Sequence, residues 1–303
     1  GDAVRDLEKT GAVAVGDIAN HSETSLAALK QSSLYALIYN EVTGFSPAIA
    51  RQRFGEFARK VIQPANPKIR QSLAPHAPYS VSADLFRLAG DFIKIHRLHS
   101  TVHLAESLDE IEFLRHGTGK IKTMIEKIGK WDATWPVPDA TPVGYLDWLG
   151  FLHERLLAVH AVHVSDADIQ ILRQKNVSVC TCPRSNRKIN VGGKAPVGKM
   201  IAAGINVCIG TDSLASNDDL NLWNEMRFLQ SVHPETGADM ILKMATINGA
   251  RALGLDDKIG SIETGKNSAL IVVTSSESIE SPETFLLSGY QNFKSISQLK
   301  IEN

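Results

Sequence analysis

His103 and Glu106 stand three positions apart at the end of a segment, residues 98–106, with the sequence Leu-His-Ser-Thr-Val-His-Leu-Ala-Glu. The segment continues into Ser-Leu-Asp-Glu-Ile, a pattern that predicts a strand followed by a helix. An imidazole and a carboxylate at a strand end are the groups that a metal-bound water needs, one to hold the cation and one to carry a proton. Taken alone, the pair is also compatible with a structural role for both side chains.

Other chemically capable side chains also close strand-like segments. A single histidine at a strand end is more often structural, but histidines on separate strands, with an aspartate on the last, favour a common site. The prolines on either side of the first of these histidines stiffen its backbone, which suits an imidazole aimed at a ligand. The strand-end residues, besides the first pair, are Glu41, His76, His160 and Asp212.

Seven apolar segments alternate with helical patterns, which indicates a parallel sheet covered on both faces. A closed (β/α)8 barrel needs eight strands, and its working groups lie at the carboxyl ends of the strands. We therefore expect the residues named above to gather at one mouth, together with a loop at 183–186. The strands are expected at 11–17, 34–41, 68–76, 98–106, 155–160, 177–182 and 205–210. Helices are expected near 22–31, 47–61, 83–96, 109–117, 121–128, 143–152, 166–175, 196–203, 220–231 and 238–253.

Two regions depart from this alternation. Residues 130–142 contain three prolines and two tryptophans, so they are expected to form a long loop that either packs on the core or covers the strand ends as a lid. Beyond residue 254 the sequence is rich in turns, with strands expected at 268–274 and 295–301 and no convincing helix between them. We divide the chain into a barrel, residues 1–254, and a small β appendage, residues 255–303.

Composition argues against several classes of partner. The 303 residues include 32 basic and 33 acidic residues, giving a net charge of −1, so no overall field attracts nucleic acid or a membrane surface. No apolar run is long enough to span a bilayer and the first residues do not resemble a secretion signal, so a cytoplasmic protein is expected. Cys180, Cys182 and Cys208 are expected to be buried; the first two share a strand face that suits a metal, but no second pair completes a four-thiolate site.

Five motifs resemble those of the amidohydrolase superfamily, in its branch of chlorohydrolases and purine-type deaminases. The resemblance covers about residues 8 to 275, and the motifs occur in the family's order. They begin at His76 (His-Ala-Pro-Tyr-Ser), His103 (His-Leu-Ala-Glu-Ser), His160 (His-Ala-Val-His-Val), Cys182 (Cys-Pro-Arg-Ser-Asn) and Gly210 (Gly-Thr-Asp-Ser-Leu-Ala-Ser-Asn).

The resemblance implies a role for each strand-end residue. His103 and Asp212 would be metal ligands, and Asp212 would also take a proton from the attacking water. Glu106 would protonate a ring nitrogen of the substrate, His160 would hydrogen-bond the water, and His76 would contact the substrate. Glu41 is either a contact for a ribose or base edge or a solvated strand end. No lysine follows the His76 strand, so one divalent ion is expected, zinc in first place and iron as the alternative.

The sequence departs from the family at one place. The family's first strand carries a His-x-His pair that supplies two more ligands, and this pair is absent, so strand one is expected to be missing from the chain. The function implied is hydrolytic deamination of an adenosine-like nucleoside or a related aminated heterocycle, by a protein expected to be a homodimer. The alternatives are hydrolysis of a C–Cl, C–S or cyclic amide bond in the same fold, and a truncated chain without catalytic activity.

Overall fold

The computed structural model describes residues 1–61, 66–275, 278–288 and 293–295, the last as backbone only. Seven parallel strands form at or near the expected places, because each is a short apolar run. Six are largely buried, whereas the first, at residues 14–19, is partly exposed along most of its length. One sheet contains β1 (Ala14–Ala19), β2 (Tyr35–Val42) and β3 (Ile69–Pro75), in that order. A second sheet contains β4 (Ser100–Leu104), β5 (Leu156–His160), β6 (Ser178–Thr181) and β7 (Val207–Ile209).

The two sheets meet between β3 and β4. The His103 backbone N–H donates to the His76 carbonyl (2.9 Å), and the Ser100 hydroxyl donates to the Leu73 carbonyl (2.6 Å). Ile18 of β1 packs both with residues of β2 and β3 and with the cysteines of β6 and β7, so the sheets curl towards each other as in a barrel. Within the described part of the chain, no strand pairs with the outer edge of β1 or of β7. Closure of a barrel by an eighth strand therefore stays a prediction.

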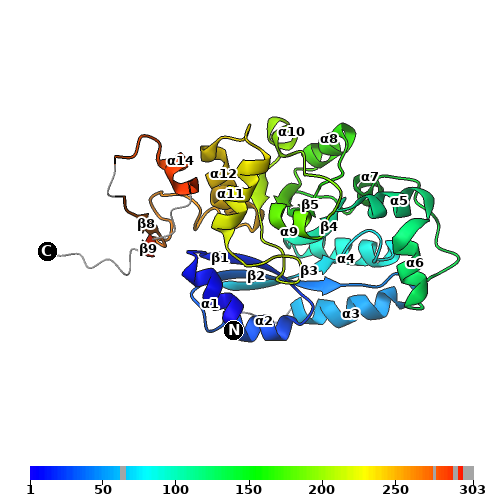
Figure 1. Ribbon diagram of the computed structural model, residues 1–303. Coiled ribbons are helices and arrows are strands. Elements are labelled where there is room, and N and C mark those ends of the chain that lie inside the picture. Colours follow the sequence, from blue (N-terminus) through cyan, green and yellow to red (C-terminus); the bar gives the residue numbers. More distant parts are fainter. Residues whose placement is uncertain (62–65, 276–277, 289–292, 296–303) are drawn as a thin grey trace.

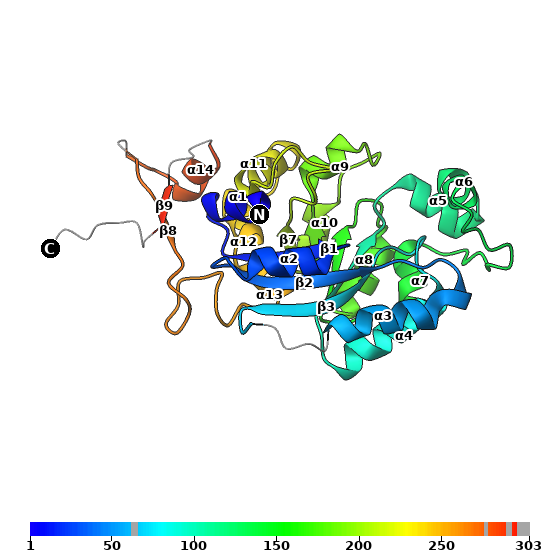
Figure 2. The same ribbon diagram turned by 90° about the horizontal axis from the view of Figure 1, so that it is seen from below.

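Helices connect the strands and cover the outside of the sheets (Figures 1 and 2). Several begin at a serine or threonine whose side-chain oxygen accepts a hydrogen bond from the first turn, as at Ser82, Ser107, Thr141 and Ser165. The first eight are α1 (Asp2–Lys9), α2 (Ser22–Leu29), α3 (Ala50–Val61), α4 (Ala83–Ile95), α5 (Leu108–His116), α6 (Gly119–Lys127), α7 (Pro142–Trp148) and α8 (Asp166–Gln174). A short 3-10 turn, Pro47–Ile49, precedes α3. The others are α9 (Pro183–Lys188), α10 (Val197–Ala202), α11 (Leu222–Val232), α12 (Ala238–Ala245), α13 (Ile247–Ala252) and α14 (Pro282–Leu287).

The main hydrophobic core lies between the second sheet and its helices. Phe86, Leu104, Phe113 and Leu114 are fully buried there. Each such side chain contributes about 1.5–3 kcal/mol when it leaves water. Packing in this core holds the strands in place. The polar side chains at the carboxyl ends of the strands therefore have a rigid backbone beneath them.

Four expectations about local structure are corrected. Residues 183–188 form helix α9 instead of a loop, with Pro183 in its first turn, where a proline has no hydrogen bond to lose. Residues 2–9, where no helix was expected, form α1. The single helix expected at 238–253 is interrupted at Thr246, whose backbone is not helical. In the C-terminal region, helix α14 separates the two strands, where we expected none.

The C-terminal strands pair antiparallel, as β8 (Ile271–Val273) with β9 (Phe293–Ser295). The part of the expected last strand beyond Ser295 lies outside the described residues. In both ribbon views this pair and α14 lie at one end of the molecule, and α5 and α6 lie at the opposite end (Figures 1 and 2). A search of the described helices finds none with the length and apolar character that a bilayer crossing requires.

Candidate active site

Three side chains from neighbouring strands converge on one point at the carboxyl ends of the sheets. The Glu41 carboxylate, near the end of β2, lies 4.0 Å from His76 Nε2 and 3.9 Å from His103 Nε2. His76 follows β3 and His103 belongs to β4, so the group spans the junction of the two sheets. One ligand atom from each residue lies within 4.8 Å of the others, which makes Glu41, His76 and His103 a group that could hold a metal ion. Two imidazoles and a carboxylate are a common donor set for zinc.

Hydrogen bonds direct the Nε2 atoms of both histidines towards this point. Ser80 donates its hydroxyl hydrogen to the Ala77 carbonyl (3.2 Å), so its oxygen accepts from His76 Nδ1 (2.6 Å). His103 Nδ1 is 3.2 Å from His160 Nε2. Because each Nδ1 has a partner, each Nε2 is left to face the Glu41 carboxylate. The donor set therefore fits a cation. The hydrogen bonds at the two Nδ1 atoms orient the imidazole rings for such an ion.

His160 connects this group to the predicted proton donor. Its side chain is buried at the end of β5, with Nε2 3.3 Å from the Glu106 carboxylate and Nδ1 2.8 Å from the Asn186 carbonyl oxygen. Register places His160 opposite Leu104 of β4, two residues before Glu106. The strand pairing thus brings Glu106 and His160 together as the sequence predicts.

Asp212 lies beyond β7 and is held by two hydroxyl groups. Ser185 and Ser216 both donate to its Oδ2, at 2.7 and 2.6 Å. Burial works to raise the pKa of Asp212, but these hydrogen bonds and the nearby His160 hold it below its ordinary value. Its carboxylate is therefore ionised at neutral pH, as a ligand or base must be. Asp212 is not a member of the Glu41 group, so the predicted shared metal role with His103 is not tested by this geometry.

The backbone is strained where these side chains leave the strands. Ala105, His160, Ala161 and Asp212 all have positive φ, at 52°, 74°, 46° and 58°, which is unfavourable for residues with a Cβ. Hydrogen bonds hold the first turn in place, since Val162 N–H and His163 N–H both donate to the Ala105 carbonyl. Such strain concentrates at functional sites, because the surrounding fold must stabilise it.

Glu110 stabilises the same turn through a hydrogen bond to its backbone. Its buried carboxyl group accepts a hydrogen bond from the Glu106 backbone N–H at 2.9 Å. Burial raises the pKa of Glu110 to about 8, against the effect of that hydrogen bond. Glu110 is therefore protonated at neutral pH and stabilises the Glu106 loop without adding a charge to the site.

The imidazole of His103 is neutral at physiological pH. Burial, reinforced by the neighbouring His160 and His76, lowers its pKa to about 3. Burial also lowers the pKa of His76. Only the neutral imidazole binds a cation, so binding at these two positions competes with no proton at neutral pH.

Four residues that orient the site were not predicted. Ser80, Ser185, Asn186 and Glu110 occur in the quoted sequence segments, but no role followed from their spacing. The partners of Ser185 and Asn186 lie 27 and 26 positions away, so only the fold reveals them, whereas those of Ser80 and Glu110 lie four positions away. The residues that were predicted for the site lie at the carboxyl ends of parallel strands, and therefore on the same side of the sheets.

The loop at 130–142 packs on two buried aromatic residues. Trp131 and Trp135 pack on Phe45 and Phe113, with the Phe113 and Trp135 rings stacked at 4.6 Å, which supports a packing role for residues 130–142.

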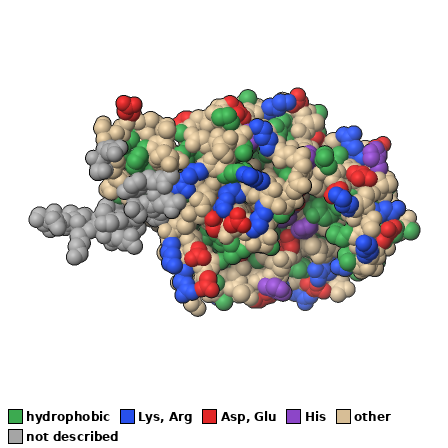
Figure 3. All heavy atoms as spheres, in the orientation of Figure 1, with side chains coloured by type: hydrophobic (Ala, Val, Ile, Leu, Met, Phe, Trp, Pro, Cys, Tyr) green, Lys and Arg blue, Asp and Glu red, His purple; other side chains and the backbone are tan. Residues whose placement is uncertain are grey.

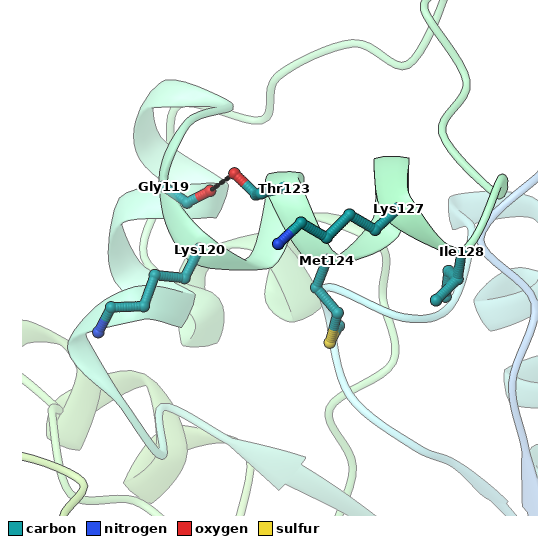
Figure 4. Close-up of a pocket in the computed structure, with 6 residues that line it drawn as sticks. All are labelled: Gly119, Lys120, Thr123, Met124, Lys127 and Ile128. Atoms are coloured by element: carbon teal, nitrogen blue, oxygen red, sulfur yellow. Dashed lines mark hydrogen bonds between the residues drawn. The ribbon is translucent and has the colours of Figure 1, made fainter.

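Charges of both signs are interspersed over the face in Figure 3. A hollow of about 720 Å³ lies over α6, apart from the predicted site (Figure 4), and is lined by Gly119, Lys120, Thr123, Met124, Lys127 and Ile128.

Curated relatives match most of the chain. The chain is 33% identical over 280 residues to 5-methylthioadenosine/S-adenosylhomocysteine deaminase of Desulforamulus reducens. This match covers 89% of the chain and 60% of the relative. It is 34% identical over 262 residues to aminodeoxyfutalosine deaminase of Deinococcus radiodurans, covering 82% of this chain and 61% of the relative. The chain thus spans about 60% of the length of these relatives.

Solved structures agree with the fold. Aminofutalosine deaminase of Helicobacter pylori, in complex with methylthio-coformycin, has a TM-score of 0.77 at 27% identity, covering 88% of this chain and 65% of that protein. An adenosine deaminase of Xanthomonas campestris with bound zinc has a TM-score of 0.71 at 29% identity, covering 87% and 58%. These neighbours support a TIM-barrel-like α/β fold. The family model of the amidohydrolase family matches residues 6–296, and the chain therefore belongs to that family.

Proposed function

We propose that the protein is a metal-dependent hydrolytic deaminase of an adenosine-like nucleoside or a related aminated heterocycle, with release of ammonia. One observation carries the proposal: a donor group suited to a cation is joined through His160 to a carboxylate that can move a proton. Relatives more than 30% identical over most of the chain are named as deaminases of this substrate class. Because the chain spans only part of those relatives, activity and substrate are proposals.

One divalent ion is proposed, with zinc in first place and iron as the alternative. His103 and Asp212 are the proposed ligands, and the structure adds Glu41 and His76 as donors next to His103. These residues would hold the ion, which would activate a water molecule for attack by lowering its pKa to about 7. A zinc-containing neighbour supports this assignment.

The remaining chemistry falls to side chains of this chain. Asp212 takes a proton from the attacking water, and His160 hydrogen-bonds that water. Glu106 gives a proton to the ring nitrogen of the substrate as the water oxygen adds to the carbon that bears the amino group. The C–N bond then breaks: the proton held by Asp212 passes to the amino group, which leaves as ammonia. The hydroxyl group of the adduct returns a proton to Glu106, and a ring carbonyl remains. His76, or Glu41 if it is not a ligand, contacts the substrate.

Architecture and assembly complete the proposal. Residues 1–254 form the barrel, with an eighth strand between the free edges of β1 and β7, and residues 255–303 belong to a β-sandwich. Support comes from the outer edges of β1 and β7, which pair with no strand among the described residues, and from the antiparallel β8–β9 pair. A cytoplasmic homodimer that acts on a small molecule, without nucleic acid or membrane, is also proposed. Light scattering of the purified protein tests the dimer.

The test is ammonia release. The purified protein is incubated with 5-methylthioadenosine, S-adenosylhomocysteine, aminodeoxyfutalosine and adenosine, and ammonia and the deaminated product are measured together. Turnover of at least one, lost on chelation and restored by zinc, is the expected result. A zinc-loaded protein that deaminates no amino-purine or amino-pyrimidine refutes the proposal. Cleavage of a C–Cl, C–S or cyclic amide bond instead identifies the alternative hydrolase, because the product differs.

A further inference from the structure

Helix α9 contains two consecutive residues that each hydrogen-bond a different predicted catalytic side chain. Ser185 donates to Asp212, and Asn186 contacts His160 Nδ1. Both are buried, with Asn186 only 4% exposed. The helix is fixed in place by Arg184, whose guanidinium pairs with both oxygens of Asp219 at 2.6 and 3.1 Å. Asn186 therefore presents its amide from a rigid support.

The hydrogen bond to Asn186 determines where the proton of neutral His160 lies. A carbonyl oxygen only accepts, so at 2.8 Å it requires a hydrogen on His160 Nδ1. The neutral ring carries one N–H, which leaves His160 Nε2 as a lone pair. That lone pair lies 3.2 Å from His103 Nδ1 and 3.3 Å from the Glu106 carboxyl group, so in this state Glu106 carries the proton that it gives in the proposed reaction and directs it at His160 Nε2.

The tautomer of His103 follows from that of His160. A lone pair on His160 Nε2 accepts a hydrogen from His103 Nδ1, because two bare nitrogens 3.2 Å apart would repel each other. Neutral His103 then has its own lone pair on Nε2. This is the atom that lies 3.9 Å from the Glu41 carboxylate, in the group suited to a cation.

We propose that Asn186 is a positioning residue: it sets the tautomer of His160 and, through His160, that of His103, so that His103 presents bare Nε2 to Glu41 and His76. The metal part of this inference rests on the proposed function, whereas the tautomers do not. Removing such a partner typically costs 10- to 100-fold in metal affinity or activity. Asn186 touches neither substrate nor ion in this proposal.

The experiment reads the tautomers directly. Protein labelled with 15N-histidine is studied metal-free at slightly alkaline pH, where ring 15N shifts and two-bond couplings show which nitrogen carries hydrogen. His160→Gln and His103→Gln identify the two resonance sets. In the wild type we expect hydrogen on Nδ1 of both rings. Asn186→Asp keeps an acceptor and should keep both tautomers, whereas Asn186→Leu, of similar size, should give a mixture in both rings.

Zinc affinity and kinetics provide the second measurement. Asn186→Leu should bind zinc about 10- to 100-fold more weakly, or lose as much in kcat with KM little changed, and Asn186→Asp should stay within a few-fold of wild type. Asn206→Leu is the matched control, since Asn206 is a part-buried amide at the amino end of β7 that bonds Ser178 and Asn248. It should change neither tautomers nor zinc affinity.

Several results would overturn the inference. Hydrogen on Nε2 of His160 in the wild type would do so, as would Asn186→Leu with unchanged tautomers and zinc affinity. If Asn186→Leu does not fold, the wild-type tautomers and those of Asn186→Asp still decide. Failure of the proposed function appears differently, as correct tautomers and bound zinc without deamination.

Discussion

The Glu106 carboxylate lies 3.3 Å from Nε2 of His160, although the two residues are 54 positions apart (160 − 106). The contact exists because β4 and β5 pair in parallel and end together, with Leu104 opposite His160. This distance is just above the range of about 2.6–3.2 Å in which acid-base groups exchange a proton, and such contacts typically tighten when substrate binds. The pair is therefore the most direct point at which to test the proposed acid-base chemistry.

Glu106→Gln should retain zinc and lose turnover. A carboxamide keeps the size of the side chain but cannot deliver a proton, and acid-base groups typically contribute 10²- to 10⁴-fold to the rate. We expect kcat to fall by about that factor, measured as ammonia release with zinc content checked by elemental analysis. Glu112→Gln, on an exposed part of α5, is the control. Turnover within a few-fold of wild type would show that Glu106 has another role.

Glu41→Gln separates two roles for this residue. If Glu41 is a ligand, zinc affinity should fall about 10-fold or more, because a neutral amide lacks the charge with which a carboxylate binds zinc. If it is a substrate contact, as the sequence suggested, zinc affinity stays and KM rises. Zinc titration of the metal-free protein and steady-state kinetics distinguish the two outcomes.

Asp212→Ala should lose both zinc and turnover. Asp212 is ionised and held by Ser185 and Ser216, so its removal takes away a proposed ligand and a proposed base together. Asp218→Ala is the control, because Asp218 is an exposed neighbour that pairs with Lys188. Full zinc occupancy in Asp212→Ala would contradict its role as a ligand and leave Glu41, His76 and His103 as the donors.

Glu110 should make the stability of the protein depend on pH. Its pKa is about 8 in the folded protein against an ordinary value of 4.5, so between these values the folded state binds more protons than the unfolded state. The free energy of unfolding should therefore decrease as pH rises through this window. Glu110→Gln should remove this slope, which urea unfolding at a series of pH values measures. Parallel curves for both proteins would exclude a buried, protonated Glu110.

Trp135→Ala tests the loop at 130–142. Because Trp135 stacks on Phe113 and is only partly buried, we expect a loss of about 1–3 kcal/mol in stability, less than the 3–5 kcal/mol of a fully buried aromatic residue. Limited proteolysis should then cut within this loop. Unchanged kcat and KM favour packing alone, whereas a rise in KM favours a lid.

The sequence predicts what local patterns determine. The seven strands follow from apolar runs, and the clustering of Glu41, His76, His103, Glu106 and His160 follows from parallel pairing. Helix α9 was missed because its six residues include proline, serine and asparagine, which locally favour a turn. It forms because Arg184 and Glu225 anchor it through long-range contacts. The roles of Ser185 and Asn186 were missed for the same reason.

The contact between β3 and β4 has a consequence for how the molecule behaves mechanically. Glu41 and His76 belong to one sheet and His103 to the other, and the backbone bond across the junction links His76 and His103 themselves. A cation held by these side chains would therefore link the two sheets across their junction. Zinc should therefore raise the melting temperature in proportion to the logarithm of its concentration above Kd. It should also slow amide hydrogen exchange most in β3 and β4, the strands on either side of this junction.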